Sequence, residues 1–228
     1  MLLSANQPYF APFPGFFHKA QLSDVFVILD AVQFPRGTTW ISRNRFKNDQ
    51  GTLWMTVPVW RKRLGLQRIN EVRIYHERGW ARKHLESLRN AYGKAPYLPD
   101  HLDFLKGIFS EGFERLIDLN MAILRHLLAH LRIETRIVLL SDLGIDQTGD
   151  LRLIEICRRL GADRFLAQAP AGKYLEEPLF KEAGITLEFF TPPTPVYPQL
   201  WGKFIPNLST LDLLLNCGPK ARDILMGF

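Results

Sequence analysis

The first 45 residues contain most of the side chains that could do chemistry. They include the segment Asn6-Gln7-Pro8-Tyr9, the acidic residue Asp30 with Gln33 after it, and a polar and aromatic segment at residues 40–45. A carboxylate can position or deprotonate an attacking amine, an amide can position it, and guanidinium groups make bidentate contacts with phosphate or carboxylate. This combination of residue types is typical of a binding or catalytic site.

Three residues of this region are candidates for catalysis, namely Asp30, Gln7 and His18. Asp30 would position or deprotonate the attacking group. His18 follows Pro14-Gly15 at a predicted helix start, where enzymes that transfer nucleotidyl groups place a histidine against phosphate. Each residue also has a structural interpretation: Asp30 as a turn cap, Gln7 as a partner of loop backbone, and His18 as a surface residue.

The predicted binding residues are Asn6, Tyr9, Gln33, Trp40, Arg43, Asn44, Arg45, Lys173, Tyr174, Tyr197, Gln199 and Trp201. Arg43 and Arg45 would clamp anionic groups, and a solvated basic loop is the competing explanation. Residues 170–174 place a glycine beside a lysine at a predicted helix start, which favours an anion or is an ordinary β-to-α turn. Residues 193–202 are too rich in proline for a helix and too aromatic for a linker, so they cover either a sugar or base, or the core.

These side chains require elements that position them, and the N-terminal region predicts a βαβ unit. Residues 1–5 and 24–29 are apolar runs of strand length, and residues 16–22 between them form a short amphipathic segment. Ligands of such sheets bind beyond the carboxyl ends of the strands. Gln7 and Asp30 fall at those two ends, which favours a functional role for both.

The remainder of the chain predicts a helical middle between two strand-rich blocks. Residues 53–60 and 69–75 are expected to form a strand pair, and residues 80–91, 103–109 and 113–131 are expected to form helices. Alternation then returns, with strands at 135–140, 164–168 and 185–190, helices at 149–160 and 174–183, and two C-terminal helices at 208–217 and 219–226.

Alternating strands and helices favour an α/β fold with a mostly parallel sheet and helices on both faces. We therefore predict a Rossmann-like three-layer fold with C-terminal helices. Residues 1–228 would form a single α/β domain, with a helical subdomain at 78–132 inserted between the two strand-rich blocks.

The composition is that of a globular protein. The 228 residues are 46% apolar, which is enough for a full core. No apolar run approaches the ~20 residues of a membrane helix, and no secretory leader is evident, so we expect no membrane span and a cytoplasmic location. The two cysteines provide no disulfide framework and no spacing for a structural metal site.

The formal net charge of +6 implies anionic partners. Basic residues concentrate in one region, as Arg36, Arg43, Arg45, Lys47, Arg61, Lys62, Arg63, Arg68, Arg73, Arg78 and Arg82. A nucleic acid, the phosphates of a nucleotide-linked sugar and an anionic membrane surface would all be attracted to such a region.

Motifs along nearly the whole chain resemble the WbqC-like family. They are Asn6-Gln7-Pro8-Tyr9 with Pro12 and Gly15-Phe16-Phe17, Ser23-Asp24-Val25-Phe26, Leu29-Asp30, Val32-Gln33-Phe34, Trp40, Arg43-Asn44-Arg45, Val57-Pro58, Tyr197-Pro198-Gln199, Leu208-Ser209, Leu211-Asp212 and Asn216-Cys217-Gly218. The chain departs from the family pattern at Asn6, where histidine is common, and at Ser42, where asparagine is common. If that histidine were a catalytic base, Asn6 could not replace it.

The resemblance implies a role in surface polysaccharides, because the family's members look like products of O-antigen and related gene clusters. A transfer of glycine to a sugar amine has been proposed for the family. Gly15, His18 and Gln33-Phe34 also faintly resemble pantothenate synthetase and related nucleotidyltransferase or HUP-like enzymes, which form an adenylate and then an amide. That likeness is an analogy at the level of the fold.

Together these observations favour an aminoacyl or acyl transferase or ligase, with glycine as candidate donor, that acts on a nucleotide-linked amino sugar in O-antigen biosynthesis. ATP with magnesium is required if the donor is activated in place, and neither is required if the donor is a thioester or is carried on transfer RNA. The alternative is a non-catalytic binder of RNA or another polyanion. Because no RNA-binding module is recognisable, it is the weaker reading, and the oligomeric state stays open.

Overall fold

The computed structural model describes residues 1–227, so Phe228 of the predicted domain lies outside the described residues. Within this range, five strands form a parallel sheet in the order β5-β2-β1-β6-β7. The strands are β1 (Leu2–Asn6), β2 (Val25–Ile28), β5 (Arg136–Leu139), β6 (Arg164–Gln168) and β7 (Thr186–Phe190). The predicted α/β class with a mostly parallel sheet is confirmed.

Strand β1 lies at the centre of the sheet and is buried on both faces. Leu3 and Ser4 are fully buried, and all four residues of β2 beside it are buried as well. The register pairs Leu3 with Val25 on one side and with Phe165 of β6 on the other. The first and second halves of the chain therefore meet at β1.

Helices cover the sheet on both faces. Helix α1 (Pro14–Gln21) connects β1 to β2, whereas α5 (Gly149–Leu160) and α6 (Glu177–Glu182) connect strands in the opposite direction along the sheet. Because such crossovers are right-handed, the two directions place their helices on opposite faces. This arrangement is the Rossmann-like three-layer fold, and α5 has the predicted bounds.

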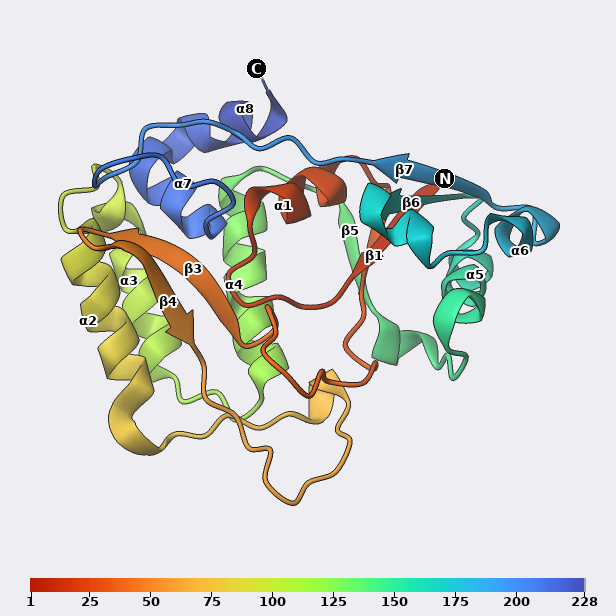
Figure 1. Ribbon diagram of the computed structural model, residues 1–228, viewed down its shortest axis with the longest axis horizontal. Helices are drawn as coiled ribbons and strands as arrows, with labels where there is room; N and C mark the ends of the chain where they lie inside the picture. Colours follow the sequence, from red (N-terminus) through yellow and green to blue (C-terminus); the bar gives the residue numbers. More distant parts are fainter. Residues whose placement is uncertain (228) are drawn as a thin grey trace.

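The middle of the chain forms a separate region beside the sheet. It consists of the hairpin β3 (Arg43–Asn48) and β4 (Gly51–Thr56) and of the helices α2 (Trp80–Tyr92), α3 (Leu98–Ser110) and α4 (Leu116–His130). Figure 1 shows α2, α3 and the hairpin at one end of the molecule, and β6, β7, α5 and α6 at the other. Buried apolar side chains form one continuous cluster through both regions.

The expected strand pair of residues 53–60 and 69–75 is wrong. Residues 51–56 instead pair with residues 43–48, and Ile69–Glu71 form the short 3₁₀ helix η1. Of the expected pairing, one isolated bridge, Val59 with Ile74, remains in the described chain. The turn at Asp49-Gln50, followed by Gly51 with φ of +107°, pairs residues 51–56 with residues 43–48, which are nearer in sequence than residues 69–75.

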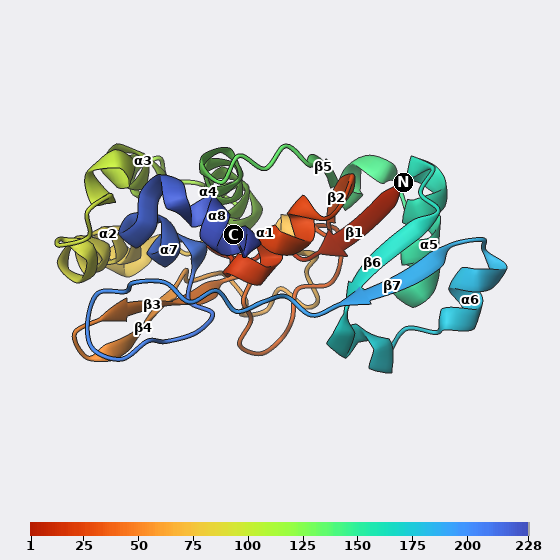
Figure 2. The ribbon, with the colours of Figure 1, turned by 90° about the horizontal axis from the view of Figure 1, so that it is seen from above.

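A long segment at residues 191–209, which we call the strap, leads from β7 to the C-terminal helices α7 (Thr210–Cys217) and α8 (Ala221–Met226). In Figure 2 it passes α1 and reaches the hairpin at the other end of the molecule. The strap therefore joins the sheet to the middle region. In the described part of the chain, no helix is long and apolar enough to cross a membrane.

Candidate functional site

The strand order places a topological switch point between β1 and β6. Connections leave these two strands in opposite directions, and ligands of open α/β sheets bind at such points beyond the carboxyl ends. Gln7 directly follows β1, and its half-buried amide makes no hydrogen bond to the described residues. Lys173 and Tyr174 follow β6, and both are exposed, Tyr174 by 82%.

Asp30 follows β2 and is only 2% exposed. Its Oδ1 accepts a hydrogen bond from the Ser141 backbone N–H at 2.9 Å, and its Oδ2 accepts one from Asn70 Nδ2 at 3.4 Å. The backbone carbonyl of Asp30 also accepts from the N–H of Asn70. Asp30 thus fixes the position of Asn70 through these two hydrogen bonds.

Asn70 lines a cavity of about 430 Å³ that we call the sheet-edge cavity. Its lining residues are Arg68, Asn70, Glu71, Arg73, Glu114 and Arg115. Burial lowers the pKa of Arg152, in the first turn of α5, and the positive charge of Arg68 lowers it further. Gln33 is exposed and pairs through its backbone with Arg68. Arg73 forms an ion pair with Glu114 at 2.7 Å, so Arg68 and Arg115 are the residues that offer guanidinium groups for an anion.

The N-terminal loop of residues 7–13 is held rigidly by two buried amides. Asn44 Nδ2 donates to the carbonyls of Phe10 and Ala11, and Asn120 Nδ2 donates to those of Pro8 and Ile41. Asn44 Oδ1 also accepts from the N–H of Arg45, so this predicted binding residue has its polar atoms engaged. The loop is therefore positioned by the middle region.

The other predicted residues of the N-terminal region are partly buried. Asn6 Nδ2 donates to the backbone carbonyl of Gln7 at 3.2 Å, and burial raises the pKa of Tyr9 while the Asn6 side chain opposes the rise. His18 packs edge-on against Phe190, with 6.0 Å between ring centroids. Burial lowers the pKa of His18, and its Nδ1 is buried without a hydrogen-bond partner in the described chain.

The hairpin gives the clearest site geometry because its two faces differ. Asn44 and Phe46 of β3 point inward and are each 1% exposed, as is Met55 of β4. Arg43 and Arg45 alternate with them on the outer face, and Arg45 lies opposite Trp54 in the register. The period of two along each strand thus places arginines and a tryptophan on one solvent-facing surface.

We call Trp40, Arg43, Arg45 and Trp54 the arginine–tryptophan face. The Arg43 guanidinium lies 3.6 Å from the ring centroid of Trp54, and that of Arg45 lies 5.8 Å from the ring of Trp40. The two indole rings are 5.7 Å apart with 31° between their planes. Their exposed fractions are 43% for Trp40 and 45% for Trp54, so both aromatic surfaces are open to a ligand.

The polar groups of this face are not all satisfied. Arg45 donates to the carbonyls of Pro206 and Asn207, yet the Nε atoms of Arg43 and Arg45 are buried without hydrogen-bond partners in the described chain. A cavity of about 250 Å³ opens beside them, lined by Phe13, Trp40, Asn44, Arg45 and Asn207. Such a surface combines ring stacking with anion binding.

The three predicted residues of the strap contact the interior of the protein. Tyr197 is 6% exposed and donates to Asp212 at 2.9 Å, and Trp201 Nε1 donates to the carbonyl of Ala91 at 2.7 Å. Gln199 Oε1 accepts from Lys47 Nζ at 3.1 Å. These contacts are those of a strap over the core, which was one of the two interpretations of residues 193–202.

The structure thus brings Trp40, Asn44 and Arg45 together at one cavity, with Arg43 beside it. Gln7 and Asp30 lie at the sheet edge, and Lys173 and Tyr174 lie beyond β6. Sequence reasoning missed Trp54, which completes the aromatic pair. The hairpin signal Asn48-Asp49-Gln50-Gly51 would have placed it opposite Arg45.

These features define a protein of the Rossmann-like α/β class with an exposed basic and aromatic surface. The chain matches the model of the WbqC-like protein family over residues 7–224, and it belongs to that family. It is 33% identical over 221 residues to "Uncharacterized protein Rv1507c" of Mycobacterium tuberculosis. The matched residues cover 96% of this chain and 95% of the relative. No solved structure matches the chain significantly.

Proposed function

We propose that the protein is a transferase that attaches an aminoacyl or similar acyl group, with glycine as candidate, to the amino group of a nucleotide-linked sugar. The arginine–tryptophan face would bind this acceptor. Trp40 and Trp54 would stack against the base or the sugar, and Arg43 and Arg45 would contact the diphosphate. Family membership supports a role in surface-polysaccharide synthesis.

One observation carries the proposal: two exposed indole rings lie 5.7 Å apart, and each has a guanidinium group beside it. A nucleotide-linked sugar has the matching chemistry, with planar or apolar faces next to two phosphates. The Arg43 guanidinium makes no hydrogen bond to the described residues, so its terminal nitrogens supply donors that a phosphate oxygen would satisfy.

The reaction centre would lie at the carboxyl edge of the sheet. Gln7 has a free amide there to orient the acceptor amine, and Asp30 acts through Asn70 on the sheet-edge cavity. In the transfer, the amine nitrogen attacks the activated carbonyl carbon, an amide bond forms, and the donor's leaving group departs while the amine loses a proton. Adenylate is the leaving group if ATP activates the donor, and a thiol or transfer RNA is the leaving group otherwise.

The test is calorimetric binding of nucleoside-diphosphate amino sugars to the wild type, Trp54→Ala and Trp60→Ala. Trp60 is a matched control, because it is also 45% exposed but lies outside the arginine–tryptophan face. Stacking on one aromatic ring contributes roughly 1–3 kcal/mol. We therefore expect Trp54→Ala to weaken binding by about 5- to 150-fold and Trp60→Ala to leave it unchanged.

Equal affinities of the three proteins would contradict the assignment of this face to the acceptor. The chemistry is checked separately, by mass spectrometry of the sugar after incubation with glycine, ATP and magnesium or with a glycyl thioester. A product with either donor names the donor class. Tight acceptor binding without product from any acyl donor would contradict the transferase while leaving the binding face intact.

A second candidate function is binding of single-stranded RNA, and the same face favours it. Exposed aromatic rings beside arginines are the usual means of binding unpaired bases without sequence preference. This function predicts an affinity for random RNA that falls log-linearly with salt concentration. Saturable binding of one small nucleotide sugar, unaffected by a competing RNA, would decide against it.

A further inference from the structure

Three histidines meet between helices α3 and α4, away from both the arginine–tryptophan face and the sheet-edge cavity. His126 and His130 are four residues apart on α4, so they lie on the same side of that helix. His101 projects from the neighbouring helix α3. One potential ligand atom from each ring lies within 4.8 Å of the other two.

The rings are held close by specific contacts. His101 Nδ1 and His126 Nε2 are 3.0 Å apart and share a hydrogen bond. Phe104 stacks on His126, with 3.6 Å between centroids and 2° between planes, and thereby fixes the orientation of its ring. His130 lies 4.6 Å from His101 and 4.3 Å from His126, measured between ring centroids. The cluster is therefore largely preorganised.

The spacing suits a tetrahedral metal ion. Zinc binds imidazole nitrogen at about 2.0–2.1 Å, which places two ligand nitrogens ~3.4 Å apart. The nitrogens of His101 and His126 are slightly closer than that, at 3.0 Å, and a ring nitrogen of the exposed His130 lies within 4.8 Å of both. Two histidines at i and i+4 on a helix are also a recurrent zinc-binding pair.

Metal coordination requires each imidazole in its neutral form, with its proton on the nitrogen that does not bind the metal. The proton between Nδ1 of His101 and Nε2 of His126 would move to the opposite nitrogen of its own ring when a metal binds.

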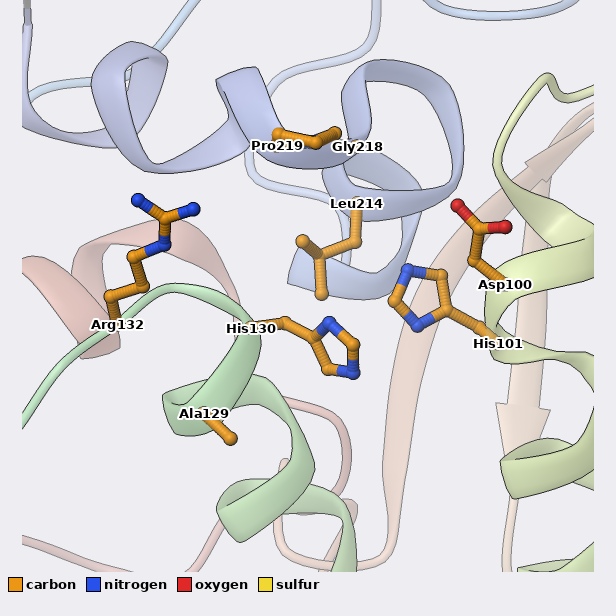
Figure 3. Close-up of a pocket in the computed structure, with 8 residues that line it drawn as sticks. All are labelled: Asp100, His101, Ala129, His130, Arg132, Leu214, Gly218 and Pro219. Carbon is orange, nitrogen blue, oxygen red and sulfur yellow. The ribbon is translucent and has the colours of Figure 1, made fainter.

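A cavity of about 230 Å³ adjoins the cluster. Figure 3 shows His101 and His130 pointing into it from opposite sides below Leu214, with Arg132 on the far side and Asp100 next to His101. Three histidine ligands with an open fourth position characterise catalytic rather than structural zinc sites. The cavity leaves that fourth position accessible to water or a small anion.

We propose that His101, His126 and His130 bind one divalent transition-metal ion of the zinc type, with a fourth position that opens into the adjoining cavity. No metal-binding residues were predicted from the sequence, and the histidine cluster differs from that prediction. The i, i+4 pair was visible in the sequence, but its third member comes from another helix. Imidazole-only sites favour zinc, copper, nickel or cobalt over magnesium or calcium.

The test is titration of chelator-treated protein with Co²⁺, followed by the visible d–d absorption of tetrahedral cobalt and by zinc competition. We expect one Co²⁺ per chain in the wild type. His130 is exposed, so His130→Ala should fold normally and remove one ligand. Loss of a residue that only supports a metal ligand lowers metal affinity by roughly 10–100-fold, so the Co²⁺ affinity of His130→Ala should fall by more than that.

Two further variants make the result specific. His130→Cys replaces imidazole with a thiolate ligand, so binding should return with an added sulfur-to-cobalt absorption. His76→Ala removes an exposed histidine outside the cluster and should bind Co²⁺ as the wild type does. Absence of binding by the wild type, or equal affinities of wild type and His130→Ala, would overturn the proposal and leave the cluster as packing alone.

Discussion

Asp212 is fully buried and accepts hydrogen bonds from two tyrosine hydroxyls, Tyr92 at 2.7 Å and Tyr197 at 2.9 Å. Burial raises the pKa of Asp212, and the bonds from Tyr92 and Tyr197 oppose that rise. The same contacts join helix α2, the strap and helix α7 at one point. The Asp212 carboxylate thus links the strap to the middle region, together with the strap contacts of Lys47 and Ala91.

Tyr197→Phe should destabilise the protein by about 1.5–3 kcal/mol, because the buried Asp212 carboxylate would lose the hydrogen bond that the Tyr197 hydroxyl donates. Chemical denaturation measures this loss, and Tyr174→Phe is the control, since Tyr174 is 82% exposed. Sequence analysis assigned Tyr197 to substrate binding. Unchanged stability with a raised KM in the Tyr197→Phe variant would favour that assignment over the structural one.

Asp30→Asn tests whether Asp30 acts through Asn70. The variant keeps an oxygen for the Ser141 N–H but turns an NH₂ group toward Asn70, so we expect a stability loss of about 1 kcal/mol. Turnover of the proposed transferase should fall at least tenfold, well beyond the loss of folded protein. Asn70→Ala alone and combined with Asp30→Asn completes a double-mutant cycle. Additive effects on turnover would show that the two residues act independently.

At the scale of elements, Lys19 ties α1 to β1. Its buried Nζ donates to the carbonyl of Ala5 at 2.7 Å, and burial lowers its pKa from 10.5 to about 8. Between pH 8 and pH 10, the unfolded chain keeps this proton while the folded protein releases it. The unfolded state then binds more protons, so Lys19 makes the free energy of unfolding rise with pH.

The measurement is the difference in unfolding free energy between wild type and Lys19→Met at pH 8, 9 and 10. The unfolding free energy of the wild type should rise relative to that of Lys19→Met by at most about 1.4 kcal/mol per pH unit. Taking the difference removes the opposing effect of Cys157 and Cys217, whose pKa values burial raises to about 12 and about 11. A difference that is constant with pH would show that the folded protein keeps Lys19 protonated.

Elements with a clear apolar pattern were predictable from sequence, and the hairpin was not. Helix α5 and strand β6 have the predicted bounds because each has a regular pattern closed by a glycine or a loop. Strand β3 buries Asn44 and Lys47, which donate hydrogen bonds to carbonyls of the N-terminal loop and of the strap. Because these buried residues are polar, the sequence of β3 resembles that of a basic loop. Residues 69–75 alternate like a strand, but tertiary contacts hold them as η1 and single bridges.

At the scale of the whole molecule, the parallel sheet followed from the βαβ pattern, whereas the strand order did not. Pairing of β1 with β6 is a contact between residues 2–4 and 164–166, which no local signal encodes. The same limit applied to the candidate site. Trp40, Arg43 and Arg45 were predictable together because they are neighbours in sequence, but the inward contacts of Tyr197, Gln199 and Trp201 depend on Asp212, Lys47 and Ala91 from distant elements.

The central place of β1 has a consequence for biosynthesis. A ribosome releases β1 about 160 residues before it can supply β6, an interval on the order of 10–30 s at typical elongation rates. During that interval, one edge of the hydrophobic strand Leu2–Asn6 has no native neighbour. An unpaired edge of this kind invites association between nascent chains on the same messenger. Yield in a heterologous host should therefore depend on chaperones that shield the N-terminal segment until the second half emerges.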